Sequence, residues 1–132
     1  MYKFGQSSTK RLLTCHTDII RVFNEVIKHV DCSVLEGHRG EELQNKYYKE
    51  GKSKVKYPNG KHNGLPSLAI DCVPYPVDWD DDKRFHLFAG FVLGISKQLN
   101  INLRWGGCWK NDFNPKENNF YDAPHFELIN ED

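Results

Sequence analysis

The centre of the sequence reads His62-Asn-Gly-Leu-Pro-Ser-Leu-Ala-Ile-Asp71-Cys-Val-Pro-Tyr-Pro76. Its apolar run over residues 68–73 predicts a buried strand, which ends at Pro74 and Pro76 because proline cannot donate to a sheet ladder. Asp71 interrupts that run, and burying a carboxylate is costly unless a positive charge or a metal ion pairs with it. The stretch therefore predicts a core strand that carries one functional carboxylate.

Outward from this strand, the sequence alternates between helical and strand-like patterns. Apolar residues recur at spacings of three, four and seven between residues 12 and 30, which predicts one amphipathic helix. His16 and His29 fall within it and are interpreted as ordinary helix residues. Further helices are predicted at 41–50 and 83–99, and further strands at 31–36, 101–105 and 120–129, the last interrupted by Pro124. This order predicts a single α+β domain.

Length and composition narrow the class of protein. The 132 residues fit one domain, and 18 basic residues balance 18 acidic ones, which argues against a nucleic-acid partner. No apolar run reaches the roughly 18 residues of a membrane span, and the amino terminus lacks the apolar segment of a secretion signal. We therefore expect a cytoplasmic protein without membrane insertion. Its cysteines are expected to be reduced thiols that fill the core: Cys15, Cys32, Cys72 and Cys108.

Candidate chemistry gathers around two histidines and two aspartates. His62 precedes the strand that carries Asp71, and His125 lies on the last predicted strand, three residues after Asp122. Two imidazoles and one carboxylate suit Zn²⁺ with a fourth position open for water, as in catalytic zinc sites. Asp122 would then act as a general base beside the metal, because Pro124 bends the chain between it and His125. The spacing alone leaves open that these histidines are structural.

Several motifs, in the same order, resemble those of the zinc peptidoglycan peptidases. This family comprises D-Ala-D-Ala carboxypeptidases and phage L-alanyl-D-glutamate endopeptidases, and it shares a fold with the signalling domain of hedgehog. The resemblance implies an antiparallel sheet flanked by helices. It covers about residues 8–128 and rests on residues 62–76, Glu36-Gly-His-Arg39, Gln44, Gly51-Lys-Ser53, Asp78-Trp79, Phe88-Ala-Gly90, Leu103-Arg-Trp-Gly-Gly107 and Asp122-Ala-Pro-His125-Phe-Glu-Leu128.

The resemblance also implies the roles of individual residues. Asp122 takes the position of the catalytic acid/base. Arg39 takes that of an arginine facing the scissile bond, where a guanidinium can stabilise the oxyanion. Trp105 matches a tryptophan near the site, which either contacts the substrate or packs behind a ligand. The implied ligands of one catalytic zinc ion are His62, Asp71 and His125.

The function that the resemblance implies is that of a phage-type endolysin, a zinc metallopeptidase that cuts the peptidoglycan stem peptide between L-Ala and D-Glu. Residues 1–132 would form one monomeric catalytic domain, without a separate cell-wall-binding module, that leaves the cytoplasm of the infected host through a holin-type pore. Three alternatives stay open: a D,D-carboxypeptidase or dipeptidase of the same family, a non-catalytic zinc-containing binding domain, and a metal-free structural protein. Asp122 argues against a binding domain, because binding needs no general base.

Overall fold

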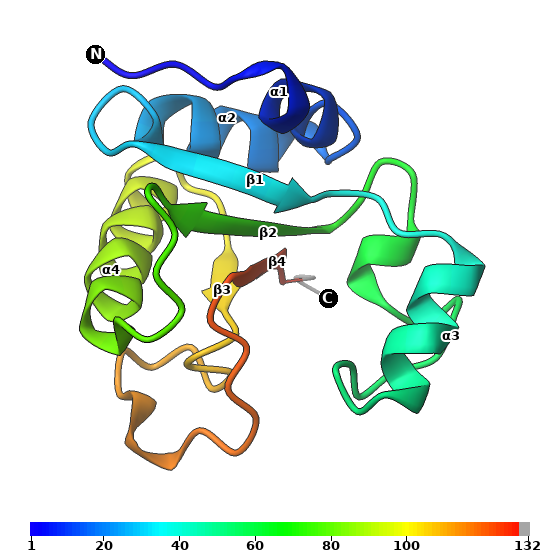
Figure 1. Cartoon of the computed structure of the whole chain (residues 1–132). Coiled ribbons are helices and arrows are strands. Elements are labelled where there is room, and N and C mark those ends of the chain that lie inside the picture. Colours follow the sequence, from blue (N-terminus) through cyan, green and yellow to red (C-terminus); the bar gives the residue numbers. More distant parts are fainter. Residues whose placement is uncertain (130–132) are drawn as a thin grey trace.

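The computed structural model describes residues 1–129 (Figure 1). Within that range the chain forms α-helices, short 3₁₀ helices and one sheet. In chain order these elements are α1 (Gln6–Leu12), α2 (Thr17–Val26), β1 (Cys32–Glu36), α3 (Glu41–Lys49), η1 (Lys61–Asn63), β2 (Ala69–Pro74), α4 (Asp82–Gln98), β3 (Leu103–Trp105), η2 (Pro115–Glu117) and β4 (His125–Leu128). Most predicted elements are therefore present, with bounds that differ by one or two residues.

The strands form one four-stranded sheet in the order β1-β2-β4-β3, and each neighbouring pair is antiparallel. Helices α2 and α4 pack against each other and cover one face of this sheet. The rings of Phe23 in α2 and Phe88 in α4 lie 5.6 and 6.2 Å from the ring of Phe126 in β4. In Figure 1, α1 lies next to β1, and α3 with η1 lies beyond the carboxyl end of that strand. The predicted α+β class with helices flanking an antiparallel sheet is confirmed.

The core is apolar and contains the cysteines. All four cysteines are free and buried, as the sequence predicts. They lie among fully buried aliphatic side chains of the sheet and of α2, including Val22, Val34 and Ile70. Because an apolar environment disfavours the thiolate, burial raises the pKa of the Cys15 thiol to about 12.

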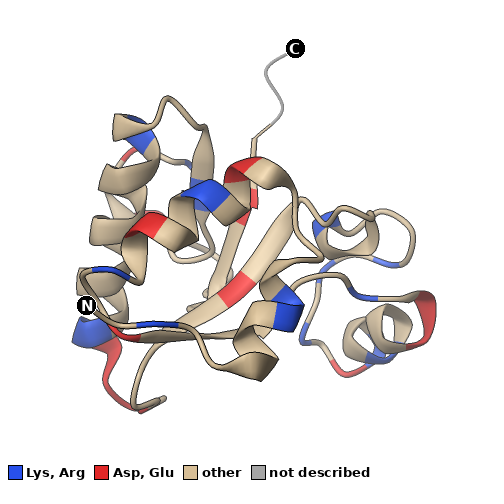
Figure 2. Cartoon of the chain, turned by 90° about the horizontal axis from the view of Figure 1, so that it is seen from above, with Lys and Arg blue, Asp and Glu red and all other residues tan. Residues whose placement is uncertain are grey.

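Charged residues of both signs are spread along the ribbon (Figure 2). The first turn of α4 is acidic, as predicted: the side chain of Asp81 accepts the amide hydrogen of Arg84, and Asp82 follows, where negative charge suits the helix dipole. In the part of the chain that the structure describes, no helix combines the length and apolar character that crossing a membrane requires.

The single helix predicted between residues 12 and 30 is wrong, because α1 and α2 replace it. The chain between them pairs with the residue that leads into β2: the amide of His16 donates to the Ser67 carbonyl, and the amide of Ser67 donates to the Thr14 carbonyl, both at 2.8 Å. His16 is the N-cap of α2, and its Nδ1 accepts the amide hydrogen of Asp18 at 3.0 Å. His29 follows the end of α2, so neither histidine lies inside a helix.

The predicted terminal strand over residues 120–129 is shorter than expected. It starts only at His125, and Ala123 and Pro124 form a turn before it. The amide of His125 donates to the carbonyl of Asp122 at 3.2 Å across this turn. The predicted bend between Asp122 and His125 is therefore present, but it lies ahead of the strand and not within it.

Candidate metal centre

His62 lies in η1 and is buried, with 2% of its surface exposed. Its Nδ1–H donates to the carbonyl of Gly37 at 2.7 Å. Position 37 requires glycine, because a Cβ there would lie 2.3 Å from the hydroxyl oxygen of Thr14 and 2.4 Å from the carbonyl oxygen of Arg11. A carbonyl oxygen can only accept, so this hydrogen bond leaves the lone pair of His62 on Nε2, free for a metal ion.

Asp71 and His125 face each other across the sheet. They are direct partners in the antiparallel pairing of β2 with β4, so both side chains leave the sheet on the same face. Their neighbours Ile70 and Phe126 are also partners and point to the opposite face, against the helices. Strand alternation therefore gives the sheet a polar face beside an apolar core face.

Three ligand atoms meet on this polar face. Nε2 of His62 lies 3.1 Å from Oδ1 of Asp71 and 3.2 Å from Nδ1 of His125, and that Nδ1 lies 3.4 Å from Oδ1 of Asp71. Tetrahedral zinc, with bonds of about 2.0–2.1 Å, holds its ligand atoms roughly 3.3 Å apart. The three atoms thus have the spacing of one face of a zinc tetrahedron. Within residues 1–129, no other group of His, Cys, Asp and Glu side chains gathers in this way.

The hydrogen bonds around the triangle direct its lone pairs inward. Nε2–H of His125 donates to Oε1 of Glu127 at 2.8 Å, which leaves the lone pair of His125 on Nδ1. Two imidazole lone pairs and the carboxylate of Asp71 therefore point at one another. Electron-rich atoms this close repel each other unless a cation lies between them. The residues present fit a divalent metal ion.

The pKa values of the cluster indicate the same preference for positive charge. Burial opposes ionisation of Asp71, but His62 and His125 outweigh it and hold the pKa of this carboxyl well below its usual range. Burial likewise opposes protonation of His125, yet its hydrogen bonds with Asp71 and Glu127 raise the pKa of the imidazole to about 9. The protein thus stabilises a cation at this place, which a metal ion supplies when bound.

Asp122 lies beside the three ligand atoms. Its Oδ2 is 3.8 Å from Nδ1 of His125, and its side chain keeps 29% of its surface exposed. The segment is fixed against the end of β3: the amide of Asp122 donates to the carbonyl of Gly106 at 2.9 Å, and a Cβ on Gly106 would lie 2.3 Å from the carbonyl oxygen of Asp122. Burial and the negative charge of Asp71 raise the pKa of Asp122 to about 6. Such a carboxylate can exchange protons near neutral pH.

Arg39 joins the site from the loop after β1. Its amide donates to the carbonyl of His62 at 2.7 Å. Its guanidinium contacts the carboxylate of Glu36, donates to the side-chain oxygen of Gln44 at 2.9 Å, and lies 3.7 Å from Oδ2 of Asp71. Only 8% of Arg39 is exposed. The structure thus brings Arg39 to the second oxygen of the metal-site carboxylate.

Trp105 does not join this group. It pairs with Phe126 in the sheet and therefore lies on the core face, opposite to His125. Its indole N–H donates to the carbonyl of Ala123 at 2.7 Å, and 4% of the residue is exposed. The structure thus shows how Trp105 packs, and contact between Trp105 and the substrate stays a prediction.

Sequence reasoning missed two residues of the polar face. Glu127 accepts the hydrogen bond of His125, and its position two residues along the same strand was the available signal, because such residues share a face. Trp109 places its ring 5.3 Å from the ring of His125 and donates its indole N–H to the carbonyl of Phe120 at 2.5 Å. Trp109 follows β3 in an irregular loop, where no periodicity predicts the direction of a side chain.

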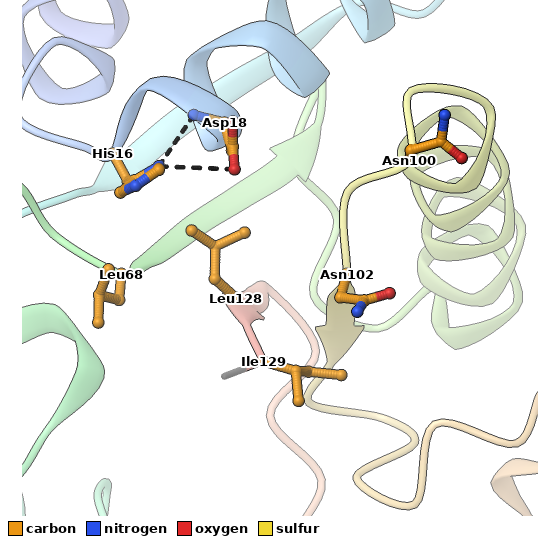
Figure 3. A pocket seen from close by; sticks show the side chains of 7 residues that line it. All are labelled: His16, Asp18, Leu68, Asn100, Asn102, Leu128 and Ile129. Carbon is orange, nitrogen blue, oxygen red and sulfur yellow. Dashed lines mark hydrogen bonds and ion pairs between the residues drawn. The ribbon is translucent and has the colours of Figure 1, made fainter. Parts of the chain in front are cut away.

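A separate cavity of about 290 Å³ lies at the carboxyl end of β4, whereas His125 lies at the amino end of that strand (Figure 3). It contains one further histidine and one further aspartate, which contact each other beside the start of α2. The residues that line it are His16, Asp18, Leu68, Asn100, Asn102, Leu128 and Ile129. The cavity is thus distinct from the metal centre, and none of its lining residues belongs to the ligand triangle.

Comparisons with known proteins identify the family of this chain and a similar solved structure. A family model described as phage L-alanyl-D-glutamate peptidase matches residues 1–129. Among solved structures, the L-Ala D-Glu endopeptidase ChiX of Serratia marcescens is similar at a TM-score of 0.75 and 28% sequence identity, over 96% of this chain and 90% of that one. No curated protein matches the sequence significantly. On the match over nearly its whole length, the chain belongs to the phage L-alanyl-D-glutamate peptidase family.

Proposed function

We propose that this chain is a zinc-dependent endolysin that hydrolyses the bond between L-Ala and D-Glu in the peptidoglycan stem peptide. Family membership and the likeness to ChiX support a peptidoglycan peptidase with this substrate. The observation that carries the proposal is the buried triangle of His62, Asp71 and His125, with ligand atoms 3.1–3.4 Å apart and Asp122 beside them. A binding domain needs the triangle but not the adjacent base.

Zinc is the metal that the donor set favours. Two imidazole nitrogens and one carboxylate oxygen suit Zn²⁺, whereas Mg²⁺ and Ca²⁺ prefer sets made of oxygen alone. Three protein ligands leave one position for water or substrate, as in catalytic zinc sites. The chemistry that zinc supplies when bound is Lewis-acid polarisation of the scissile carbonyl and of the attacking water.

Asp122 is proposed as the general base and acid. It takes the proton from the water as the oxygen of that water bonds to the carbonyl carbon, and it returns the proton to the amine of D-Glu as the carbon–nitrogen bond breaks. Its raised pKa suits both steps, because the carboxylate accepts the proton near neutral pH and still releases it. Its side chain is 29% exposed, so a substrate can reach it.

Arg39 is proposed to stabilise the negative charge that develops on the carbonyl oxygen. Its guanidinium is fixed by Glu36 and Gln44, so it does not need to reorganise when that charge forms. The contact with Asp71 gives it a second task, because it holds the oxygen of Asp71 that does not face the two histidines.

The setting of the enzyme belongs to the same proposal. A phage peptidase of this family acts on the host cell wall, and we propose that residues 1–132 form a monomeric catalytic domain that reaches the wall from the cytoplasm after holin-type release. Size-exclusion chromatography with light scattering tests the monomer. Lysis of cells that express the protein with and without a holin tests the route.

Product analysis of purified muropeptides tests the bond that is cut. We expect zinc-loaded protein to release fragments with a new D-Glu amino terminus, which mass spectrometry identifies. Free D-Ala among the products would instead favour the D,D-carboxypeptidase alternative, which shares every residue of the site. Zinc binding without any product would favour the non-catalytic binding domain.

A further inference from the structure

Glu127 lies on the polar face of the sheet between a ligand histidine and an arginine. It is 5% exposed, and its two carboxylate oxygens have different partners. Oε1 accepts Nε2–H of His125 at 2.8 Å, and Oε2 accepts from the guanidinium of Arg104, with Nη2 at 2.8 Å and Nε at 3.1 Å. A buried carboxylate is tolerated only when it is paired in this way. Glu127 thus links the metal centre to a cation on the neighbouring strand.

The sheet fixes this link from both sides. Glu127 follows His125 by two residues on β4, so both side chains share a face, and Arg104 of β3 is its direct partner in the pairing. Trp109 covers the group: its ring lies 5.3 Å from that of His125, and the guanidinium of Arg104 lies 5.6 Å from its centroid. The imidazole of His125 therefore has little freedom to rotate.

We propose that Glu127, held by Arg104, is a positioning residue that fixes His125 with Nδ1 aimed at the metal and makes that nitrogen a stronger ligand. An acceptor on Nε2–H forces the tautomer whose lone pair lies on Nδ1, and a carboxylate acceptor also increases the basicity of the ring. The inference rests on the proposed metal site, and it adds residues to which the proposed reaction assigns no task.

The two ligand histidines differ in this respect. His62 donates its outer N–H to a neutral acceptor, the carbonyl of Gly37, whereas His125 donates to an ionised acceptor that is itself paired with an arginine. A charge-assisted hydrogen bond is roughly twice as strong as a neutral one. His125 is therefore the more firmly oriented of the two ligands, and its orientation depends on side chains that can be changed.

Zinc affinity of the metal-stripped protein, measured by competition with a chromophoric chelator, tests the proposal. We expect Glu127→Gln, which keeps an acceptor but loses the charge, to weaken zinc binding about tenfold, and Glu127→Ala to weaken it up to about 100-fold. The matched control is Glu117→Gln, which breaks an exposed pair with Lys110 on the same half of the chain and should leave the affinity unchanged. Circular dichroism of each metal-free variant checks that it is folded.

A second measurement separates positioning from a purely structural ion pair. NMR of the imidazole nitrogens of zinc-loaded wild type should show His125 protonated on Nε2, and Glu127→Ala should disturb this resonance while that of His62 stays in place. As a single substitution, Arg104→Gln should weaken zinc binding. Added to Glu127→Gln, it should have little further effect, because Arg104 acts through Glu127.

Zinc affinities of both Glu127 variants within about twofold of wild type, with the His125 tautomer unchanged, would overturn the inference, since outer partners contribute more than this where they orient a ligand. So would an independent effect of Arg104→Gln in the Glu127→Gln background. Absence of zinc binding by the wild type itself would contradict the proposed metal site, so the two failures are distinguishable.

Discussion

His62 with Asp71 and His16 with Asp18 are two histidine–aspartate pairs in surroundings that differ. The first pair lies beside His125, where β4 begins; its nitrogen and oxygen are 3.1 Å apart, and the side chains are 3% and 16% exposed. The second lines the cavity of Figure 3, with its atoms 3.9 Å apart and side chains 36% and 41% exposed. Residue types alone do not distinguish the two pairs.

The use of the imidazole nitrogens distinguishes them. In His16 the ring nitrogen Nδ1 accepts the backbone amide hydrogen of Asp18 and so caps α2, which occupies the lone pair of that nitrogen. In His62 the Nδ1–H donates to the backbone carbonyl of Gly37. The lone pair on Nε2 therefore stays free and points at two further ligand atoms. A histidine that caps a helix stabilises the fold. A histidine whose second ring nitrogen is held by a hydrogen bond can bind a metal with the first.

The largest effect is expected from His125→Ala. This change removes one of three ligands, so we expect both bound zinc and peptidoglycan hydrolysis to be lost. Metal content by atomic emission and muropeptide digestion by mass spectrometry provide the measurement. The matched control is His16→Ala, which should keep both. Equal losses in the two variants would mean that the comparison between the pairs is mistaken.

Asp122→Asn is expected to separate catalysis from metal binding. The amide keeps the shape of the side chain but accepts no proton, so hydrolysis should fall by about 10²–10⁴-fold while zinc content stays at the wild-type level. Rates on purified muropeptides, with zinc measured on the same samples, check this. An active Asp122→Asn enzyme would assign the base to another group.

The pH dependence of hydrolysis is expected to have an acid limb governed by Asp122. The base must be ionised, and its pKa is raised to about 6, so the rate should fall about tenfold per unit as the pH drops below that value. Bound zinc shifts the midpoint downwards, because a nearby positive charge favours the carboxylate. Initial rates of the zinc-loaded enzyme, measured from about pH 4 to about pH 8, provide the test, because this range extends to both sides of that pKa. A rate that rises toward acid would contradict this assignment.

The smallest effect is expected from His16→Ala. Loss of the hydrogen bond to the amide of Asp18 removes the side-chain cap of α2, which should lower the free energy of unfolding by about 1 kcal/mol. The melting temperature should then drop by a few degrees, as measured by circular dichroism. An unchanged melting temperature would show that the cap contributes nothing, and a loss of zinc would extend the metal site to this pair.

The candidate site was predictable where its signals are local. Asp71 was recognisable as a carboxylate on an apolar strand. Asp122 was recognisable because it lies three residues before His125, with Pro124 between them. Both features are present in the structure, because strand alternation places Asp71 beside His125 and a single turn places Asp122 beside His125. Arg39 could be assigned only through the family resemblance, since its partner Gln44 is a buried residue of a helix that reads as polar and exposed.

The errors arose where distant parts of the chain decide local structure. The break between α1 and α2 depends on backbone hydrogen bonds between residues 14–16 and Ser67, which no helical periodicity reveals. The family resemblance places Trp105 near the site and leaves open whether it packs or contacts substrate, and only its register with Phe126 shows that it lies on the core face of the sheet. Register between strands is a tertiary property, so one sequence does not fix which tryptophan faces the candidate metal site.

The most direct test of the central claim is the zinc content of the purified protein, measured together with its digestion of muropeptides, for wild type and His125→Ala. The account predicts about one zinc ion per wild-type chain and cleavage between L-Ala and D-Glu, with both lost in the variant. A wild-type protein that cleaves this bond without zinc, or a His125→Ala protein that keeps both metal and activity, would contradict it.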